Sequence, residues 1–233
     1  MKKIFLFLLI SFIFSQFINA QDKAFQFGFK IAPNIGWMKT NAQGYENDGV
    51  KPGFSWGFVG DIHLMENYWI NTGFNVNFIH CAYHYPHQIP ASGGSSSYVV
   101  GTLNRDLITK YIQLPIVFRM KTNENNGITY FGEIGFGLGF LFDAKASDKF
   151  YEGEVLIKET DKVDVVNEFR FTRESLILGA GMEFAIGETN KLTTGLRFDN
   201  CFFDIMKDQN SIDPSIEQKG MSNFIELQVC FLF

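Results

Sequence analysis

The sequence predicts an all-β fold, an eight-stranded antiparallel up-and-down transmembrane β-barrel. Eight segments alternate apolar residues with polar residues or glycine, and a period of two indicates a β-strand because successive side chains point to opposite faces. Short and long connections alternate strictly between these segments, which is typical of barrels that cross a membrane. The last segment ends the chain on an aromatic residue, Phe233.

The closing segment, residues 223–233, illustrates the pattern. Glu226 and Gln228 lie on its polar face, whereas its apolar face is unbroken. A final strand that ends in phenylalanine is typical of outer-membrane barrels, so we expect this segment to close a ring against the first strand. The residues on the apolar face are Ile225, Leu227, Val229, Phe231 and Phe233.

Residues 1–20 have the features of a secretory signal peptide. Lys2 and Lys3 precede a short apolar stretch, and Ala20 ends a suitable cleavage site. An uncleaved membrane anchor is the alternative, but the apolar stretch is too short to span a bilayer comfortably. We therefore expect cleavage of the leader and one outer-membrane β-barrel domain over residues 21–233.

The charge of the chain argues against nucleic acid as a partner. The formal net charge is −5, and it becomes −7 once the two lysines of the leader are removed. The chain therefore lacks the basic stripe that would neutralise phosphates. Phenylalanine is very common, yet no segment after the leader approaches the length of about 18 consecutive apolar residues that a membrane helix needs.

The cysteines do not resemble a disulfide framework, because their number is odd and their spacing is scattered. Cys201 and Cys230 would approach each other only if their strands paired in a suitable register. We favour free, buried thiols at Cys81, Cys201 and Cys230.

Each strand is defined by its alternation. Pro33 interrupts the first strand and predicts a bulge or a strand end nearby, because proline cannot donate to the ladder. In the fifth strand Phe136 and its apolar neighbours oppose a row of glycines. The predicted strands span about residues 25–37, 53–65, 68–82, 107–120, 128–142, 168–186, 191–203 and 223–233.

The connections divide into two classes. Because transmembrane barrels have short periplasmic turns and long outer loops, we expect both termini and the short turns in the periplasm, and the protein in the outer membrane. The predicted turns are residues 66–67, 121–127 and 187–190, and the predicted loops are residues 38–52, 83–104, 143–167 and 206–220.

The apolar face is expected to meet lipid and the polar face to line a narrow lumen. A lipocalin-like soluble barrel is disfavoured because the apolar face carries almost no charge and the polar face is rich in glycine. Charges of both signs would pair in a lumen that has room only for side chains, so we expect it to be plugged. The inward residues include Lys30, Asp61, Tyr111, Gln113, Arg119, Glu133, Glu183, Arg197, Asp199 and Glu226, with an aromatic girdle at Trp37, Trp56, Tyr68 and Tyr130.

Four stretches carry a resemblance to a known family, namely Phe27–Asn34, Tyr111–Ile116, Tyr130–Gly135 and Leu178–Phe184. They resemble the PorT-like outer-membrane β-barrel family of the Bacteroidota. The resemblance covers the whole mature chain and implies the same barrel. The founding member is linked to protein secretion and surface export, which implies an accessory role in secretion here. The shared motifs look structural, so no catalytic or binding residue is carried over.

One cluster contains metal-type ligands, namely His80, Cys81, His84 and His87. A zinc or copper site needs three or four converging ligands, whereas this stretch enters an irregular loop. We therefore favour an interfacial or loop patch.

Asp61 and His63 share the lumen-facing side of one strand, as at the start of a hydrolase constellation. Ser55 on the same face lies too far along the strand to suggest a nucleophile. A lumen hydrogen-bond network is favoured, so we predict no catalytic, cofactor-binding or metal-binding residue, and no cofactor.

These observations favour a small integral outer-membrane protein without enzymatic activity. It would act through surface loops, including the charged stretches 143–164 and 204–217, or through envelope partners. The alternatives are an outer-membrane enzyme that modifies lipid or peptide, and a narrow solute channel. Expected partners are outer-membrane lipid, the barrel-assembly machinery during insertion, and secretion or envelope proteins.

Overall fold

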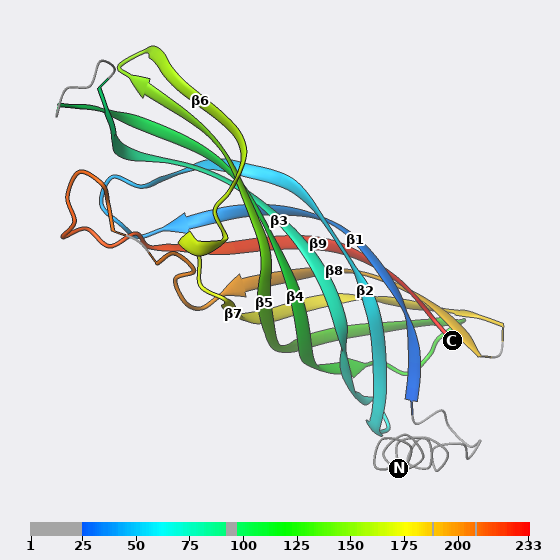
Figure 1. Cartoon of the computed structure of the whole chain (residues 1–233). Helices are drawn as coiled ribbons and strands as arrows, with labels where there is room; N and C mark the ends of the chain where they lie inside the picture. Colours follow the sequence, from blue (N-terminus) through cyan, green and yellow to red (C-terminus); the bar gives the residue numbers. More distant parts are fainter. Residues whose placement is uncertain (1–24, 92–96, 188, 208) are drawn as a thin grey trace, which may run out of the picture.

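The computed structural model describes residues 25–91, 97–187, 189–207 and 209–233, so the predicted signal peptide lies outside the described residues. The described residues form nine strands and one short 3-10 helix (Figure 1). Within these ranges no helix is long and apolar enough to cross a membrane. The elements are β1 (Phe25–Thr40), β2 (Glu46–Met65), β3 (Tyr68–Pro90), β4 (Tyr98–Lys121), β5 (Ile128–Glu152), β6 (Val155–Asp164), η1 (Val166–Glu168), β7 (Thr172–Ile186), β8 (Asn190–Cys201) and β9 (Gly220–Leu232).

Eight of the described strands close into the predicted ring. Neighbouring strands are antiparallel in the order β1-β2-β3-β4-β5-β7-β8-β9, and β9 returns to β1. Phe29 lies opposite Phe231 in this closing pair, as the terminal strand pattern predicted. β6 stands outside the ring and pairs with the outer part of β5 alone (Figure 1).

The two ends of the barrel differ. The end with the short turns, called the turn end here, holds the three tight connections that the sequence predicts, and the chain finishes there (Figure 1). At the opposite end, called the hairpin end, three of the four predicted loops are largely strand. β3 continues to Pro90, β4 begins at Tyr98, and β5 continues to Glu152 before β6 folds back.

The physical reason for this error is a reversal of the two faces. Beyond the lipid, a strand meets water on its outer face and the apolar core on its inner face, so outward residues become polar and inward residues apolar although backbone pairing continues. β2 likewise begins at Glu46, inside the first predicted loop. The predicted loop at residues 206–220 is irregular in its described part, apart from isolated bridges.

The expected break at Pro33 does not occur, because β1 runs unbroken to Thr40. Pro33 lies opposite Phe54 on β2. The pairing of β1 with β9 passes from Ile31 to Asn34 without a change of register, so the strand accommodates the missing N–H without a bulge.

The two faces are assigned as predicted. Outward side chains are apolar and exposed, with exposed fractions of 56% at Phe58, 63% at Phe136 and 59% at Leu196. Tyr68 and Tyr130 of the predicted girdle are also exposed. Ten of the residues that were expected to point inward are buried: Lys30, Asp61, Tyr111, Gln113, Arg119, Glu133, Glu183, Arg197, Asp199 and Glu226.

Glycines on the inner face leave space for large side chains opposite them. A Cβ atom at Gly179 would lie 2.6 Å from Oε1 of Glu133, and one at Gly137 would overlap the amide of Gln113. The glycine row is therefore a consequence of a narrow ring whose interior is filled from the neighbouring strands.

We predict that Gly179→Ala destabilises the barrel by about 1–3 kcal/mol, because the added methyl group overpacks the lumen against Glu133. Gly132→Ala is the matched control, since a Cβ there meets no heavy atom within 4 Å. Urea unfolding of both variants in detergent micelles, followed by tryptophan fluorescence, measures the difference. Equal unfolding midpoints would show that the inner face is not tightly packed at Gly179.

Candidate functional site

The lumen between the turn end and the hairpins is filled by paired charges. In this described part of the ring, five buried cationic side chains accompany five buried carboxylates, so their formal charges cancel. The predicted pairing of mixed-sign charges is confirmed. The cations are Lys30, Arg119, Lys121, Arg173 and Arg197, and the carboxylates are Asp61, Glu133, Glu183, Asp199 and Glu226.

Glu133 on β5 is the centre of this network. It accepts hydrogen bonds from Arg119 Nε and Nη2 at 3.0 and 2.9 Å, and from Arg197 Nε at 2.8 Å. Asp61 on β2 accepts from Arg119 Nη1 at 3.0 Å and from Lys121 Nζ at 3.1 Å. The chain of pairs crosses the barrel from β2 to β8 and occupies its cross-section.

A second polar layer lies nearer the hairpins. Gln113 Nε2 on β4 donates to Asp199 on β8 at 2.8 Å, and its Oε1 accepts from Asn77 on β3 at 3.0 Å. Arg173 on β7 pairs with Asp199 at 2.7 Å. Because β5 and β7 separate β4 from β8 in the ring, Gln113 reaches across part of the lumen.

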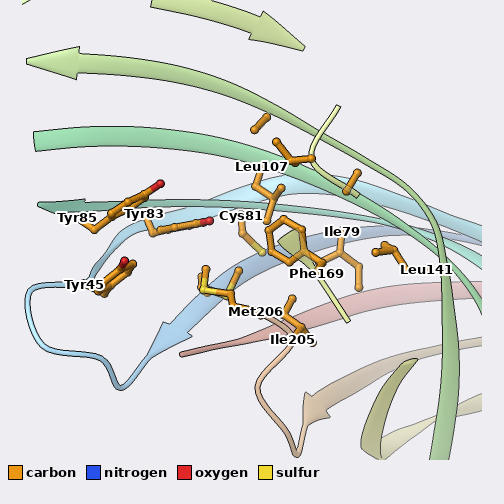
Figure 2. Close-up of a cluster of buried hydrophobic side chains, with 14 of the residues drawn as sticks. Tyr45, Ile79, Cys81, Tyr83, Tyr85, Leu107, Leu141, Phe169, Ile205 and Met206 are labelled. Atoms are coloured by element: carbon orange, nitrogen blue, oxygen red, sulfur yellow. The ribbon is translucent and has the colours of Figure 1, made fainter. Parts of the chain in front are cut away.

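Beyond this layer the interior becomes apolar, which the sequence did not predict. Figure 2 shows the cluster, in which Cys81 and Leu107 of the wall surround Phe169. Phe169, Ile205 and Met206 come from the connections that flank β7 and β8, and all three are buried. These connections fold inward and fill the hairpin end of the lumen.

Polar contacts hold these connections in place. Arg105 on β4 donates to both carboxylate oxygens of Asp148 at 2.8 and 2.7 Å, and its Nη1 also donates to Glu168 in η1. Asn210 Nδ2 donates to the Tyr45 hydroxyl at 3.1 Å and to a backbone carbonyl of β3 at 2.9 Å. The hairpin end is closed by its own chain.

The turn end is open by comparison. A cavity of about 680 Å³ lies there, and Lys191 in its lining pairs with Glu183 of the charged network at 3.6 Å. Its lining includes His63, Glu66, Trp69, Glu124 and Lys191. The lumen is therefore a vestibule with a filled interior, and the described structure shows no passage through it.

Two groups beyond the membrane-spanning strands have shifted pKa values. Burial alone would raise the pKa of Asp106, but hydrogen bonds from Lys51 and His80 outweigh it and lower the pKa. Burial lowers the pKa of His87, and the positive charge of Arg105 adds to this effect. Asp106 is therefore held as a carboxylate and His87 as a neutral imidazole.

The predicted metal-type cluster does not converge. His80 contacts Asp106, His84 Nδ1 contacts Asp48 at 2.6 Å, and His87 contacts a serine of the β8–β9 connection. Cys81 is buried in the apolar core. No group of three or more His, Cys, Asp or Glu residues in the described part of the chain is arranged to hold a metal ion.

The structure also separates Asp61 from His63, the two residues that resembled the start of a hydrolase site. Asp61 is buried in the charged network, whereas the His63 ring packs against Trp69 with the ring centres 4.5 Å apart, and His63 contacts the Glu66 carbonyl at 3.1 Å. Ser55 accepts a hydrogen bond from Asn34 at 3.0 Å. The structure brings Asp61 to cations and not to His63, as a lumen network requires.

The cysteines are free and buried, as we favoured, and all three lie within the described residues. Cys230 pairs in register with Thr193 near the turn end of β8, whereas Cys201 lies at the opposite end of that strand. The two thiols are thus kept apart although their strands are neighbours.

Sequence reasoning missed Arg105 and Arg173. Arg173 alternates correctly with the inward Ser175 and Ile177, so its facing could have been read from the strand pattern. Arg105 lies between the predicted loop at residues 83–104 and the predicted strand that begins at about residue 107, and its buried position depends on strand pairing above the membrane.

The closed ring, the apolar outer face and the charged lumen define an outer-membrane barrel, and the sequence comparison agrees. The family described as "Outer membrane protein beta-barrel domain" matches residues 14–207. The chain belongs to this family, and the outer membrane is its location. The narrower resemblance to PorT-like proteins stays a prediction. The comparison with curated proteins found no match.

Solved structures with a similar fold share little sequence with the chain. Neisserial surface protein A is 10% identical, with a TM-score of 0.40, and covers 87% of this chain and 95% of its own. OprG from Pseudomonas aeruginosa is 10% identical, with a TM-score of 0.39, and covers 89% and 94%. The outer membrane protease OmpT from Escherichia coli is 8% identical, with a TM-score of 0.36, and covers 93% and 98%.

We predict that Glu133→Ala destabilises the barrel by roughly 3–5 kcal/mol, because it leaves Arg119 and Arg197 buried without their shared partner. Glu159→Ala is the control, since the exposed Lys149–Glu159 pair should contribute less than about 1 kcal/mol. Unfolding in urea, with the gel shift of unboiled samples as a second readout, compares the two. A loss at Glu133 no larger than that at Glu159 would contradict the role of the network.

Proposed function

We propose that the protein is a non-enzymatic outer-membrane barrel that presents its hairpin end to envelope partners, in a role accessory to protein secretion. The observation that carries this proposal is the uneven height of the wall. β3, β4 and β5 contain 23, 24 and 25 residues, whereas β8 and β9 contain 12 and 13. The extra length projects beyond the apolar band and forms a platform on one side (Figure 1).

The proposal places both termini and the turn end in the periplasm, and the platform at the cell surface. Short periplasmic turns and long outer segments are the general rule for such barrels, and the uneven connections of this chain fit that rule. The resemblance to PorT-like proteins supports the link to secretion.

β6 supplies the contact surface in this proposal. It pairs with β5 on one side, and no strand among the described residues pairs with its other edge. Val155, Leu156 and Ile157 are exposed along its first half. Lys162 has a positive φ of 49°, and the pairing with β5 shifts register near it and again between Phe150 and Tyr151, where the register passes over Ile157. An exposed edge of this kind suits a partner that adds an extended strand.

An enzymatic role is not favoured, because the carboxylate nearest to a catalytic pattern is already committed. Asp61 is shared by Arg119, Lys121 and Asn71 inside the lumen. Alanine at Asp61 would also break this network and could unfold the barrel. His63→Ala is therefore the better variant for testing whether the protein has enzymatic activity. Under the proposal this variant keeps its fold and its partner.

We expect a photoreactive amino acid at Ile157 to crosslink an envelope protein in cells that make this barrel, because the β6 edge is unpaired and exposed. The control position is Met65, which is more exposed than Ile157 (62% against 44%) but lies at the turn end. Gel analysis of membranes reports the adducts. A folded protein that gives no adduct at Ile157, or the same adduct at both positions, would exclude β6 as the contact surface.

The filled lumen also predicts that the barrel does not conduct ions. In planar bilayers the folded protein should produce no stable conductance steps, because the charged network and the apolar core both close the interior. This conductance measurement distinguishes the proposed function from the alternative of a narrow solute channel. Steady steps that persist after repurification would instead favour solute conduction.

A further inference from the structure

A crevice of about 350 Å³ opens on the outer surface of the barrel, on the tall side where β2, β3 and β4 leave the apolar band. It belongs neither to the lumen nor to the β6 edge. Its lining residues are Pro52, Gly53, Phe54, Phe78, His80 and Ile108. We call this set the wall crevice.

The floor and sides of the wall crevice are apolar. Phe54 is 42% exposed and continues the lipid-facing row of β2, and Phe78 and Ile108 are half-buried. Gly53 contributes only backbone to the lining, because a Cβ there would meet the buried Asn34 side chain and the Phe78 carbonyl. The pairing of β2 with β3 is also irregular between Val50 and Phe54, which interrupts the smooth wall.

Cationic groups border the same crevice. Lys51 Nζ contacts Asp106 at 2.8 Å, and His80 contacts the same carboxylate. Lys110 Nζ lies 5.6 Å from the centre of the Phe78 ring and pairs with Asp143 at 2.7 Å. The two lysine side chains remain 33% and 30% exposed. Since an ammonium group has three N–H donors, each lysine can bind a further acceptor while its aspartate holds it in place.

We propose that the wall crevice binds a phosphorylated membrane lipid, with an acyl chain against Phe54 and Phe78 and the phosphate on Lys51 and Lys110. The crevice is continuous with the lipid-facing band, so its occupant comes from the bilayer itself. Charge complementarity selects an anionic headgroup at the height where the apolar band ends. The carboxylates Asp106 and Asp143 orient the lysines toward the headgroup.

The test compares two lipids that differ only in the phosphate. The mature protein is purified in detergent, supplied with phosphatidic acid or with diacylglycerol of the same chains, and examined by native mass spectrometry. Phosphatidic acid should be retained in preference. Lys51→Gln with Lys110→Gln should reduce its retention roughly tenfold, because two charge-assisted hydrogen bonds are weakened. Lys149→Gln, on the exposed hairpin, should leave retention unchanged.

A second variant tests the apolar part. Ile108→Trp should fill the crevice and reduce retention of phosphatidic acid, whereas Leu196→Trp on the opposite, lipid-facing wall should not. The gel shift of unboiled samples confirms that each variant is folded. Equal retention of the two lipids, or equal losses in the crevice variants and their controls, would overturn the proposal.

Discussion

The structure depends on one constraint, the closure of the backbone ladder within the membrane. Hydrocarbon offers no hydrogen-bond partner to an unpaired N–H or carbonyl group, so the last strand must pair with the first. β9 meets this requirement by pairing with β1. A ring of this size encloses only enough space for side chains, and the glycine rows, the balanced charges and the absence of a described passage all follow from that limit.

The lumen combines two solutions to filling a narrow interior. Near the turn end, Glu133 and its arginine partners satisfy one another, because an unpaired charge away from water would be costly. Near the hairpins, Phe169, Ile205 and Met206 close the interior by apolar packing. The charged network is made by side chains of the strands themselves, whereas the apolar packing uses connections that fold back into the lumen. The barrel therefore leaves its outer surface and its projecting strands as the places where other molecules can bind.

The ring, its facing and the short turns were predictable, because in lipid the contrast between the two faces of a strand is physical and appears as alternation. Arg119 and Glu133 could be placed inside for the same reason. β6 and the buried Arg105 could not be predicted from the same pattern, since beyond the lipid the outer face of a strand meets water although the strands continue to pair. The apolar core was missed because its central residues, such as Phe169, lie in irregular connections.

β5 is the one described strand that joins three neighbours. It pairs with β4 along nearly its whole length, with β7 in the ring, and with β6 beyond it. A pull on the tip of the β5–β6 hairpin would thus act along the strand and load the rungs of the β4–β5 ladder together, in shear, instead of opening them one by one. The long β5 strand that makes the wall uneven should therefore also make the barrel resistant to a force applied at its hairpin end.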